Sequence, residues 1–292
     1  MKRPQPAWRS LLFVPVTAER FIAKAHTRGA DSIILDLEDS ILPAHKAVAR
    51  SALAAAVPRV GQAGSDVVVR INRPLNLAVH DIVAAVMPGV AALMLPKLMG
   101  PEHVRLLSEV VAECEARKRM EIGSTRFIGL VETPAALPQL FAIAAADPRM
   151  AAMSVGGEDL ATELGADPSP DAMYAFAMQG LAASKAAGIL PMGSMGHFAQ
   201  LDNLDAYRDG LRRGRRLGFA TASCIHPSHV PIINEEYGVA PEDEDRARRL
   251  VEAFEAAAAD GLGAVAFEGS MIDLPVVERA RRLLDRAAAW SR

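Results

Sequence analysis

The sequence predicts an α/β protein, a (β/α)8 TIM barrel followed by a C-terminal helical lid segment. Eight short apolar segments alternate with longer, Ala-rich amphipathic segments along the chain. Nearly continuous apolar strands are typical of parallel sheets that are buried on both faces. Eight strand–helix repeats favour closure into a barrel. An open doubly wound sheet is the alternative, but no glycine-rich dinucleotide-binding turn follows the first strand.

The predicted elements follow in order along the chain. The eight strands are expected within residues 10–15, 31–39, 66–73, 92–97, 127–133, 150–157, 188–193 and 222–227. Amphipathic segments such as 18–29 and 101–119 are expected to form the helices between them. Three glycines stand at the ends of predicted helices, just before the next strand, and suit left-handed C-caps: Gly29, Gly188 and Gly218.

The residues after the eighth strand differ from the barrel repeats. We expect a catalytic barrel domain over residues 1–235 and a lid or oligomerisation segment over residues 236–292. The second segment contains a charged helix at 241–263, then a short extended piece and another helix within 264–290. A segment this short is not expected to form a core of its own. It should therefore pack on the barrel or on a neighbouring subunit.

Composition limits the class of protein. The chain of 292 residues is 51% hydrophobic and 23% charged, with a net charge of −3. It lacks the basic excess that nucleic-acid binding requires, and no apolar segment is long enough to span a bilayer. Two cysteines argue against a disulfide framework. We therefore expect a soluble, cytoplasmic protein with neither nucleic-acid nor membrane partners.

Charged and polar side chains stand at the ends of six of the predicted strands. They are Asp36, Glu38, Asp39, Arg70, Asn72, Lys97, Glu132, Asp159 and His226. In (β/α)8 barrels, the carboxyl ends of the strands and the loops that follow them form the active site. Each residue alone could be a helix cap or a paired strand-end residue, but together they predict a catalytic mouth.

Two of these carboxylates suit a hard metal ion. Mg²⁺ binds through one or two carboxylates and keeps positions for water and substrate, whereas zinc prefers the Cys and His ligands that are scarce here. Glu132 and Asp159 are therefore the predicted Mg²⁺ ligands. Arg70 offers a planar cation for a carboxylate or an enolate. Gly156 and Gly157 lack a Cβ, so their backbone amides could approach a bound substrate closely.

The acidic residues after the second strand have two possible roles. Asp36, Glu38 and Asp39 could orient Lys97, Arg70 and metal-bound water as supporting groups around the site. Buried ion pairs without a catalytic function are an equally good interpretation.

Seven motifs occur in a family-specific order along the chain. They are "RSLLFVP", "ILDLEDSILPAHKAVAR", "VRIN", "LMLPK", "GLVETPAAL", "VGGEDLATELG" and "CIHPSHVPIIN". The chain thereby resembles the citrate lyase β-subunit-like family of the HpcH/HpaI aldolase superfamily, which includes malyl-CoA and citramalyl-CoA lyases. The resemblance covers nearly the whole chain, because "GSMIDLPVVERA" is similar to the family's C-terminal segment.

The resemblance implies a Mg²⁺-dependent lyase that reversibly cleaves a 3-hydroxyacyl-CoA into acetyl-CoA, or a relative of it, and a 2-oxo acid. It implies that Glu132 and Asp159 hold the metal and that Glu132, Gly156 and Gly157 lie at the substrate. Arg70 would contact the substrate and stabilise the thioester enolate. Asp273 would be the catalytic acid/base, contributed by an adjacent subunit of a homotrimer or homohexamer.

The sequence departs from the family's pattern where the acyl and CoA groups would bind. Val16 stands where a glycine is common, and "GFATASCIHP" lacks a lysine that relatives often carry. The departures leave the substrate open. The alternatives are the β subunit of citrate lyase acting on a carrier-bound citryl group, a malyl-CoA thioesterase and an aldolase for free 2-oxo acids.

Overall fold

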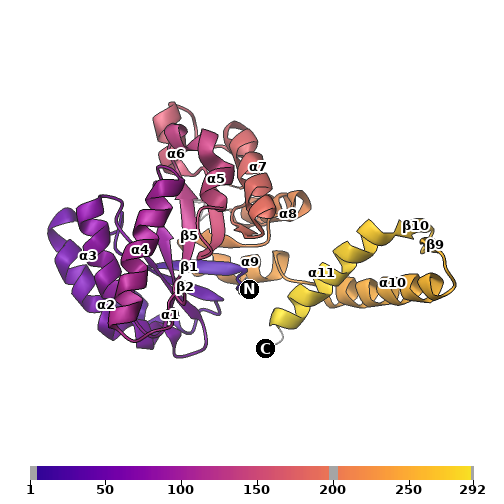
Figure 1. Ribbon diagram of the computed structural model, residues 1–292, viewed down its shortest axis with the longest axis horizontal. Coiled ribbons are helices and arrows are strands. Elements are labelled where there is room, and N and C mark those ends of the chain that lie inside the picture. Colours follow the sequence, from indigo (N-terminus) through magenta and orange to yellow (C-terminus); the bar gives the residue numbers. More distant parts are fainter. Residues whose placement is uncertain (1–4, 197–202, 291–292) are drawn as a thin grey trace. The chain divides into compact units, whose positions relative to one another are not determined.

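The computed structural model describes residues 5–196 and 203–290. By its internal contacts the chain forms two compact units, 1–237 and 238–292. Figure 1 shows the first unit as a sheet surrounded by helices, and the second as two long helices with a small hairpin.

The first unit is a parallel barrel. Within the described residues its sheet has eight strands, in the order β7-β6-β5-β4-β3-β2-β1-β8. A parallel bridge between Met192 and Thr221 closes the sheet between β7 and β8. The predicted (β/α)8 barrel is therefore confirmed. The strands are β1 Ser10–Pro15, β2 Ser32–Asp36, β3 Asp66–Arg70, β4 Val90–Leu95, β5 Arg126–Val131, β6 Met150–Val155, β7 Leu190–Pro191 and β8 Ala222–Cys224.

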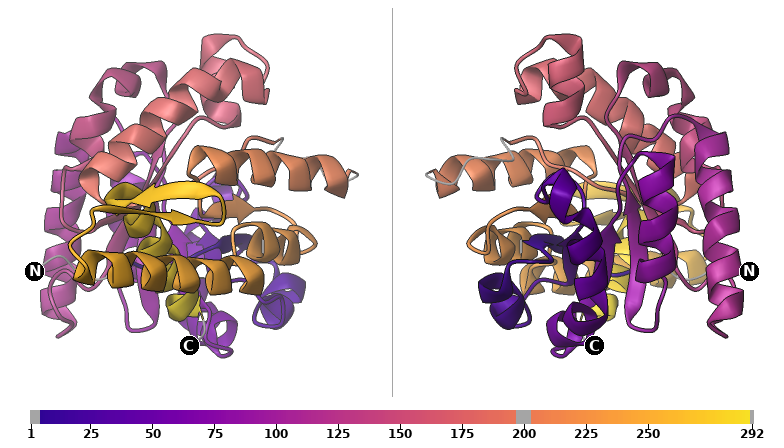
Figure 2. Two further views of the ribbon diagram at one scale, coloured as in Figure 1. Left: turned by 90° about the vertical axis from the view of Figure 1, so that its right-hand side faces the viewer. Right: turned by 90° about the vertical axis from the view of Figure 1, so that its left-hand side faces the viewer.

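The helices pack around the sheet (Figures 1 and 2). They are α1 Glu19–Ala25, α2 Lys46–Gly61, α3 Leu75–Ala85, α4 Pro101–Arg117, α5 Leu140–Ala144, α6 Glu158–Leu164, α7 Pro170–Ala187, α8 Leu204–Leu217 and α9 His229–Glu236, with short 3₁₀ helices at Pro43–His45 and Pro134–Gln139. Ser169 and Asn203 cap the amino ends of α7 and α8 through their side chains. Such side-chain caps satisfy amide groups that the first helical turn leaves unpaired.

Two predicted element ends differ from the structure. Gly188 and Gly218 cap α7 and α8 in the left-handed conformation, as expected. Gly29 also has a positive φ of 71°, but α1 already ends at Ala25, so Gly29 belongs to the turn that leads into β2. The seventh strand is only two residues long and ends at Pro191, although the amides of Met192 and Gly193 still donate to Met153 and Thr221 on either side.

Side chains of the strands alternate between two apolar cores. Ile33 and Leu35 pack in the cluster between the sheet and the helices. Ile34 lies between them in sequence and packs inside the barrel with Val68 and Ile128. This alternation is the physical reason for the continuous apolar segments, because both faces of each strand are buried.

A buried ion pair joins helix α4 to the amino end of β6. Glu115 and Arg149 are fully or almost fully buried, and two guanidinium nitrogens of Arg149 lie 2.9 and 2.7 Å from the carboxylate oxygens. The amides of Gly123 and Thr125 also donate to this carboxylate. Burial opposes ionisation, but the Arg149 and amide hydrogen bonds outweigh it and lower the pKa of Glu115 to about 2.

We expect Glu115→Ala to lower the free energy of unfolding by about 3–5 kcal/mol, because it leaves Arg149 charged and buried. The stabilisation of wild type by this pair should be complete above the ordinary pKa of 4.5 and lost as the pH falls toward 2. Urea unfolding at several pH values measures both effects. Glu113→Ala is the control, since Glu113 forms an exposed pair with Arg117 on the same helix; its loss should cost less than about 1 kcal/mol. Equal losses of unfolding free energy in the two variants would contradict a stabilising role for the buried Glu115–Arg149 pair.

The second unit contains two helices and a hairpin. Helix α10 spans Pro241–Ala259, β9 (Ala264–Phe267) pairs with β10 (Ser270–Asp273) in antiparallel fashion, and α11 spans Leu274–Trp290. Phe254, Ile272 and Val277 belong to a small apolar cluster within the unit. The expectation that this segment lacks a core of its own is therefore wrong. The hairpin makes the difference, because it places Ile272 against the helices.

No described helix combines the length and the apolar character needed to cross a membrane.

Candidate functional site

A cavity of about 780 Å³ opens at the carboxyl ends of the barrel strands. Most of the residues predicted for the site line it, namely Asp36, Asp39, Arg70, Glu132, Gly156, Gly157, Asp159 and His226. The barrel brings them together because parallel strands present their carboxyl ends at one mouth. Glu38 and Lys97 adjoin the same residues, because Glu38 pairs with Arg70 and Lys97 pairs with Asp159.

Arg70 is the centre of a group of carboxylates. Its position on β3 is the register partner of Asp36 on β2. Its Nε and Nη2 atoms each donate to Asp36 at 2.7 Å, and its Nη1 atom lies 2.8 Å from Glu38 and 3.4 Å from Asp39. The guanidinium also lies over the ring of Phe13, 4.8 Å from the centroid. These contacts fix the orientation of the planar cation.

The neighbouring carboxyl groups respond differently to this environment. Burial tends to raise the pKa of Asp36, but hydrogen bonds from Arg70 and from the backbone at Ser40 and Glu38 outweigh it and lower the pKa. Burial dominates at Glu38, and its pKa is raised despite Arg70 and Lys97. Asp36 is thus a permanent counter-ion for Arg70, whereas Glu38 binds a proton more readily.

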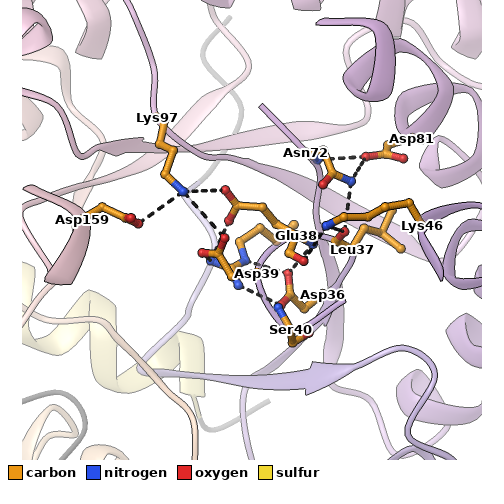
Figure 3. Close-up of polar contacts among 11 residues, drawn as sticks. Asp36, Leu37, Glu38, Asp39, Ser40, Lys46, Asn72, Asp81, Lys97 and Asp159 are labelled. Atoms are coloured by element: carbon orange, nitrogen blue, oxygen red, sulfur yellow. Dashed lines mark hydrogen bonds and ion pairs between the residues drawn. The ribbon is translucent and has the colours of Figure 1, made fainter. Parts of the chain in front are cut away.

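Lys97 connects this group to the opposite side of the mouth (Figure 3). Its Nζ atom lies 2.9 Å from Glu38, 3.7 Å from Asp39 and 3.4 Å from Asp159. Its backbone has an unusual positive φ of 48°, and its amide donates to Glu132 at 3.0 Å. One residue therefore contacts both predicted metal ligands, one through the side chain and one through the backbone.

Sequence analysis missed two residues, Lys46 and Asp81, that support the segments following β2 and β3. The Lys46 ammonium donates to the backbone carbonyl oxygens of Leu37 and Glu38. Asp81 accepts hydrogen bonds from both the backbone and the side-chain amide of Asn72 (Figure 3). Asp81 is fully buried on α3. Asp81 could have been noticed in the sequence, because it is a charged residue on the apolar face of that helix, next to Ala78, Ile82 and Ala85.

Glu132, a predicted metal ligand, has a carboxyl group with a strongly altered pKa. Burial, together with the nearby charges of Glu38 and Asp159, raises the pKa of its carboxyl group to about 7, although the Lys97 amide and ammonium favour ionisation. A divalent cation would favour the ionised form. Within residues 5–196 and 203–290, no group of three or more His, Cys, Asp or Glu side chains could hold a metal. Two carboxylates with water or substrate completing the shell fit Mg²⁺.

Two glycines make the turn that carries Asp159. Gly156 and Gly157 have φ values of 112° and 87°, which other residues rarely adopt. Gly157 is the N-cap residue of α6, and Glu158 and Asp159 lie in the first turn of this helix. The sharp turn therefore places two carboxylates where the strand leaves the barrel.

Asp273 belongs to the second unit. It is the last residue of β10, is exposed, and directly precedes α11. Its role as a catalytic acid stays a prediction.

Residues 9–227 match the HpcH/HpaI aldolase/citrate lyase family, and this range includes the whole described wall of the cavity. Citrate lyase subunit beta of Escherichia coli strain K12 is 31% identical over 282 residues, which are 96% of this chain and 93% of that protein. A (3S)-malyl-CoA thioesterase of Cereibacter sphaeroides (strain ATCC 17029) is 28% identical and aligns with 97% of this chain and 95% of its own length.

A solved structure resembles the chain over its full length. Protein CitE of Mycobacterium tuberculosis, in complex with magnesium, acetoacetate and coenzyme A, has a TM-score of 0.73 and 32% identity, and covers 99% of this chain and 100% of its own. These similarities confirm the predicted family and the predicted class of enzyme, a lyase. The chain belongs to the HpcH/HpaI aldolase/citrate lyase family.

Proposed function

We propose that this protein is a Mg²⁺-dependent carbon–carbon lyase that cleaves, or forms, a 3-hydroxyacyl-CoA of the malyl-CoA or citramalyl-CoA type. The products are acetyl-CoA, or a relative of it, and a 2-oxo acid. The observation that carries the proposal is the pair of carboxylates, Glu132 and Asp159, at one mouth with the fixed guanidinium of Arg70. The complex of the related CitE protein with magnesium, acetoacetate and coenzyme A supports it.

Glu132 and Asp159 would hold the metal. When bound, Mg²⁺ supplies a Lewis acid for the carboxylate and the oxygen of a 2-oxo acid. Lys97 assists on the protein side, because its amide orients Glu132 and its ammonium lies near Asp159. Gly156 and Gly157 leave the wall beside these ligands without side chains, so a substrate can approach the backbone there.

Cleavage breaks the bond between C2 and C3 of the acyl group. The hydroxyl on C3 loses its proton and becomes the carbonyl of the 2-oxo acid, and C2 receives a proton to complete the acetyl group. Asp273 of an adjacent subunit is the proposed acid/base for these transfers, in a homotrimer or homohexamer. A carboxylate in a closed site can have its pKa raised enough for this role.

Arg70 is the proposed group that stabilises the enolate oxygen. Four of its five N–H groups are accounted for by Asp36, Glu38 and Asp39. One N–H, on Nη2, is left for a substrate oxygen. Because the cation is already oriented, it need not reorganise when negative charge develops, which is the most effective kind of electrostatic catalysis.

The test uses the purified full-length chain with malyl-CoA and citramalyl-CoA, with and without Mg²⁺. Acetyl-CoA, 2-oxo acid and free CoA are each quantified. A lyase releases equal amounts of acetyl-CoA and 2-oxo acid only with Mg²⁺. Release of free CoA without acetyl-CoA would instead indicate a thioesterase, as in the Cereibacter relative. Turnover of a carrier-bound citryl group alone would indicate a citrate lyase β subunit, and cleavage of free acids alone would indicate an aldolase.

We expect Arg70→Lys to lower kcat on the order of 100-fold, since a lysine cannot bind Asp36 through two nitrogens and still present a donor to substrate. Steady-state kinetics measures the loss. The matched control is Arg50→Lys, which weakens a similar ion pair with buried Asp81 outside the cavity and should keep kcat within a few-fold. Comparable kcat for Arg70→Lys and wild type would reduce Arg70 to a structural partner of Asp36.

A further inference from the structure

The cavity has an apolar floor inside the barrel. Met94, Leu130 and Met192 line it and belong to the buried cluster within the barrel, against which Phe13 also packs. Leu130 is in β5 and lies two residues before Glu132, which follows the end of the strand, and both residues line the cavity. The cavity that contains Glu132 therefore continues onto apolar residues inside the barrel.

This floor is distinct from the outer part of the cavity. Leu12 and Val14 also line the cavity, but they belong to the cluster between the sheet and the helices. Arg28 lines the cavity from the segment that follows α1, and α1 covers the outer face of β1. Arg28 therefore reaches the cavity from the side of α1 and the outer cluster.

The charges around the floor are unsuited to a second anionic group. Among the described residues, the cavity wall carries five carboxylates but only two guanidinium groups, those of Arg28 and Arg70. Arg70 has four nitrogen–oxygen contacts with carboxylates. The nearby Lys97 ammonium lies within 4 Å of three carboxylates, those of Glu38, Asp39 and Asp159. One substrate carboxylate can bind at the metal, but every described cation at or beside the wall except Arg28 already contacts carboxylates, so a second carboxylate has no cation of its own there.

Resting on the proposed lyase function, we propose that the site selects a 2-oxo acid with an uncharged alkyl substituent, and that Met94, Leu130 and Met192 recognise this substituent. Pyruvate, the 2-oxo acid of citramalyl-CoA, has such a group. Glyoxylate, from malyl-CoA, leaves the floor without contact. Oxaloacetate, from citryl-CoA, places a second carboxylate on the floor. This carboxylate loses its hydration and gains no cationic partner, so its binding is unfavourable.

The experiment compares cleavage of citramalyl-CoA, malyl-CoA and citryl-CoA by the full-length protein with Mg²⁺. We expect kcat/KM for citramalyl-CoA to exceed kcat/KM for malyl-CoA by about tenfold or more, which is the effect of one buried methyl group. It should exceed kcat/KM for citryl-CoA by about 100-fold or more, because a buried carboxylate without a partner is costly. Equal or faster cleavage of malyl-CoA or citryl-CoA would overturn the inference and leave the lyase function intact. Cleavage of none of the three would overturn both.

Two leucines provide matched variants for the floor. Leu130→Ala enlarges it and should shift the ratio of kcat/KM toward the ester with an ethyl in place of the methyl substituent, derived from 2-oxobutanoate, by about tenfold. Leu95→Ala removes the same atoms from a buried residue in the outer cluster and should leave the ratio unchanged. Leu130→Val is a milder change if the alanine variant does not fold. An unchanged ratio in folded Leu130 variants, or an equal shift in Leu95→Ala, would refute recognition by the floor.

Discussion

Replacing Glu132 by glutamine is expected to lower Mg²⁺-dependent turnover by about 1,000-fold or more, because a Lewis acid contributes several kcal/mol to such reactions. Glutamine preserves the size of the side chain and its bond from the Lys97 amide, but it removes the charge that binds the cation. Asp159→Asn should have a similar effect. Turnover and direct calorimetric titration with Mg²⁺ are measured on the same preparations.

The titration also has an expected pH dependence. With the pKa of Glu132 raised to about 7 in the metal-free protein, a proton competes with Mg²⁺ near neutral pH. Affinity should therefore rise as the pH increases through 7, with release of protons on binding. Glu158→Gln is the control, since this exposed carboxylate adjoins Asp159 in the same helical turn; it should retain Mg²⁺ binding. Wild-type affinity in Glu132→Gln and Asp159→Asn would eliminate the proposed metal site.

Much of the fold could be predicted because burial leaves a direct trace in the sequence. Strands such as Ser32–Asp36 are buried at every position, and this produces the continuous apolar segments from which the barrel was predicted. The boundaries of short elements were harder to predict from the sequence. Strand β7 ends at Pro191 and α1 ends at Ala25, where local backbone chemistry and tertiary packing decide the boundary.

The site could be predicted only in part. Strand ends identified Asp36, Arg70 and Glu132, and the order of the strands accounts for the pairing of Asp36 with Arg70 across adjacent strands. The contacts of Lys46 and Asp81 depend on where helices settle against the loops. Periodicity does not contain that information, because such contacts join residues on different elements through side-chain geometry.

Asp273→Asn is expected to lower kcat by about 100-fold to 10,000-fold if Asp273 is the acid/base. The residue lies where α11 begins, so an N-cap role is the competing explanation. Asparagine caps helices as well as aspartate does, but it cannot exchange a proton, so the variant separates the two roles. Ile272 is buried in the unit's own cluster while Asp273 is exposed, so the carboxylate of Asp273 is accessible to another group. Turnover and thermal unfolding are measured together.

Mixing subunits tests whether the acid acts across an interface. Asp273→Asn and Glu132→Gln homomers should each be inactive, but in a randomly co-assembled 1:1 mixture about a quarter of the sites combine an intact barrel with an intact neighbouring acid. Asp285→Ala, which removes another exposed aspartate of α11, should leave activity unchanged. A mixture that stays inactive despite proven co-assembly would refute sharing between subunits. An active Asp273→Asn homomer would reduce the residue to a helix cap, and the proton transfers would then require a group at the mouth of the barrel itself.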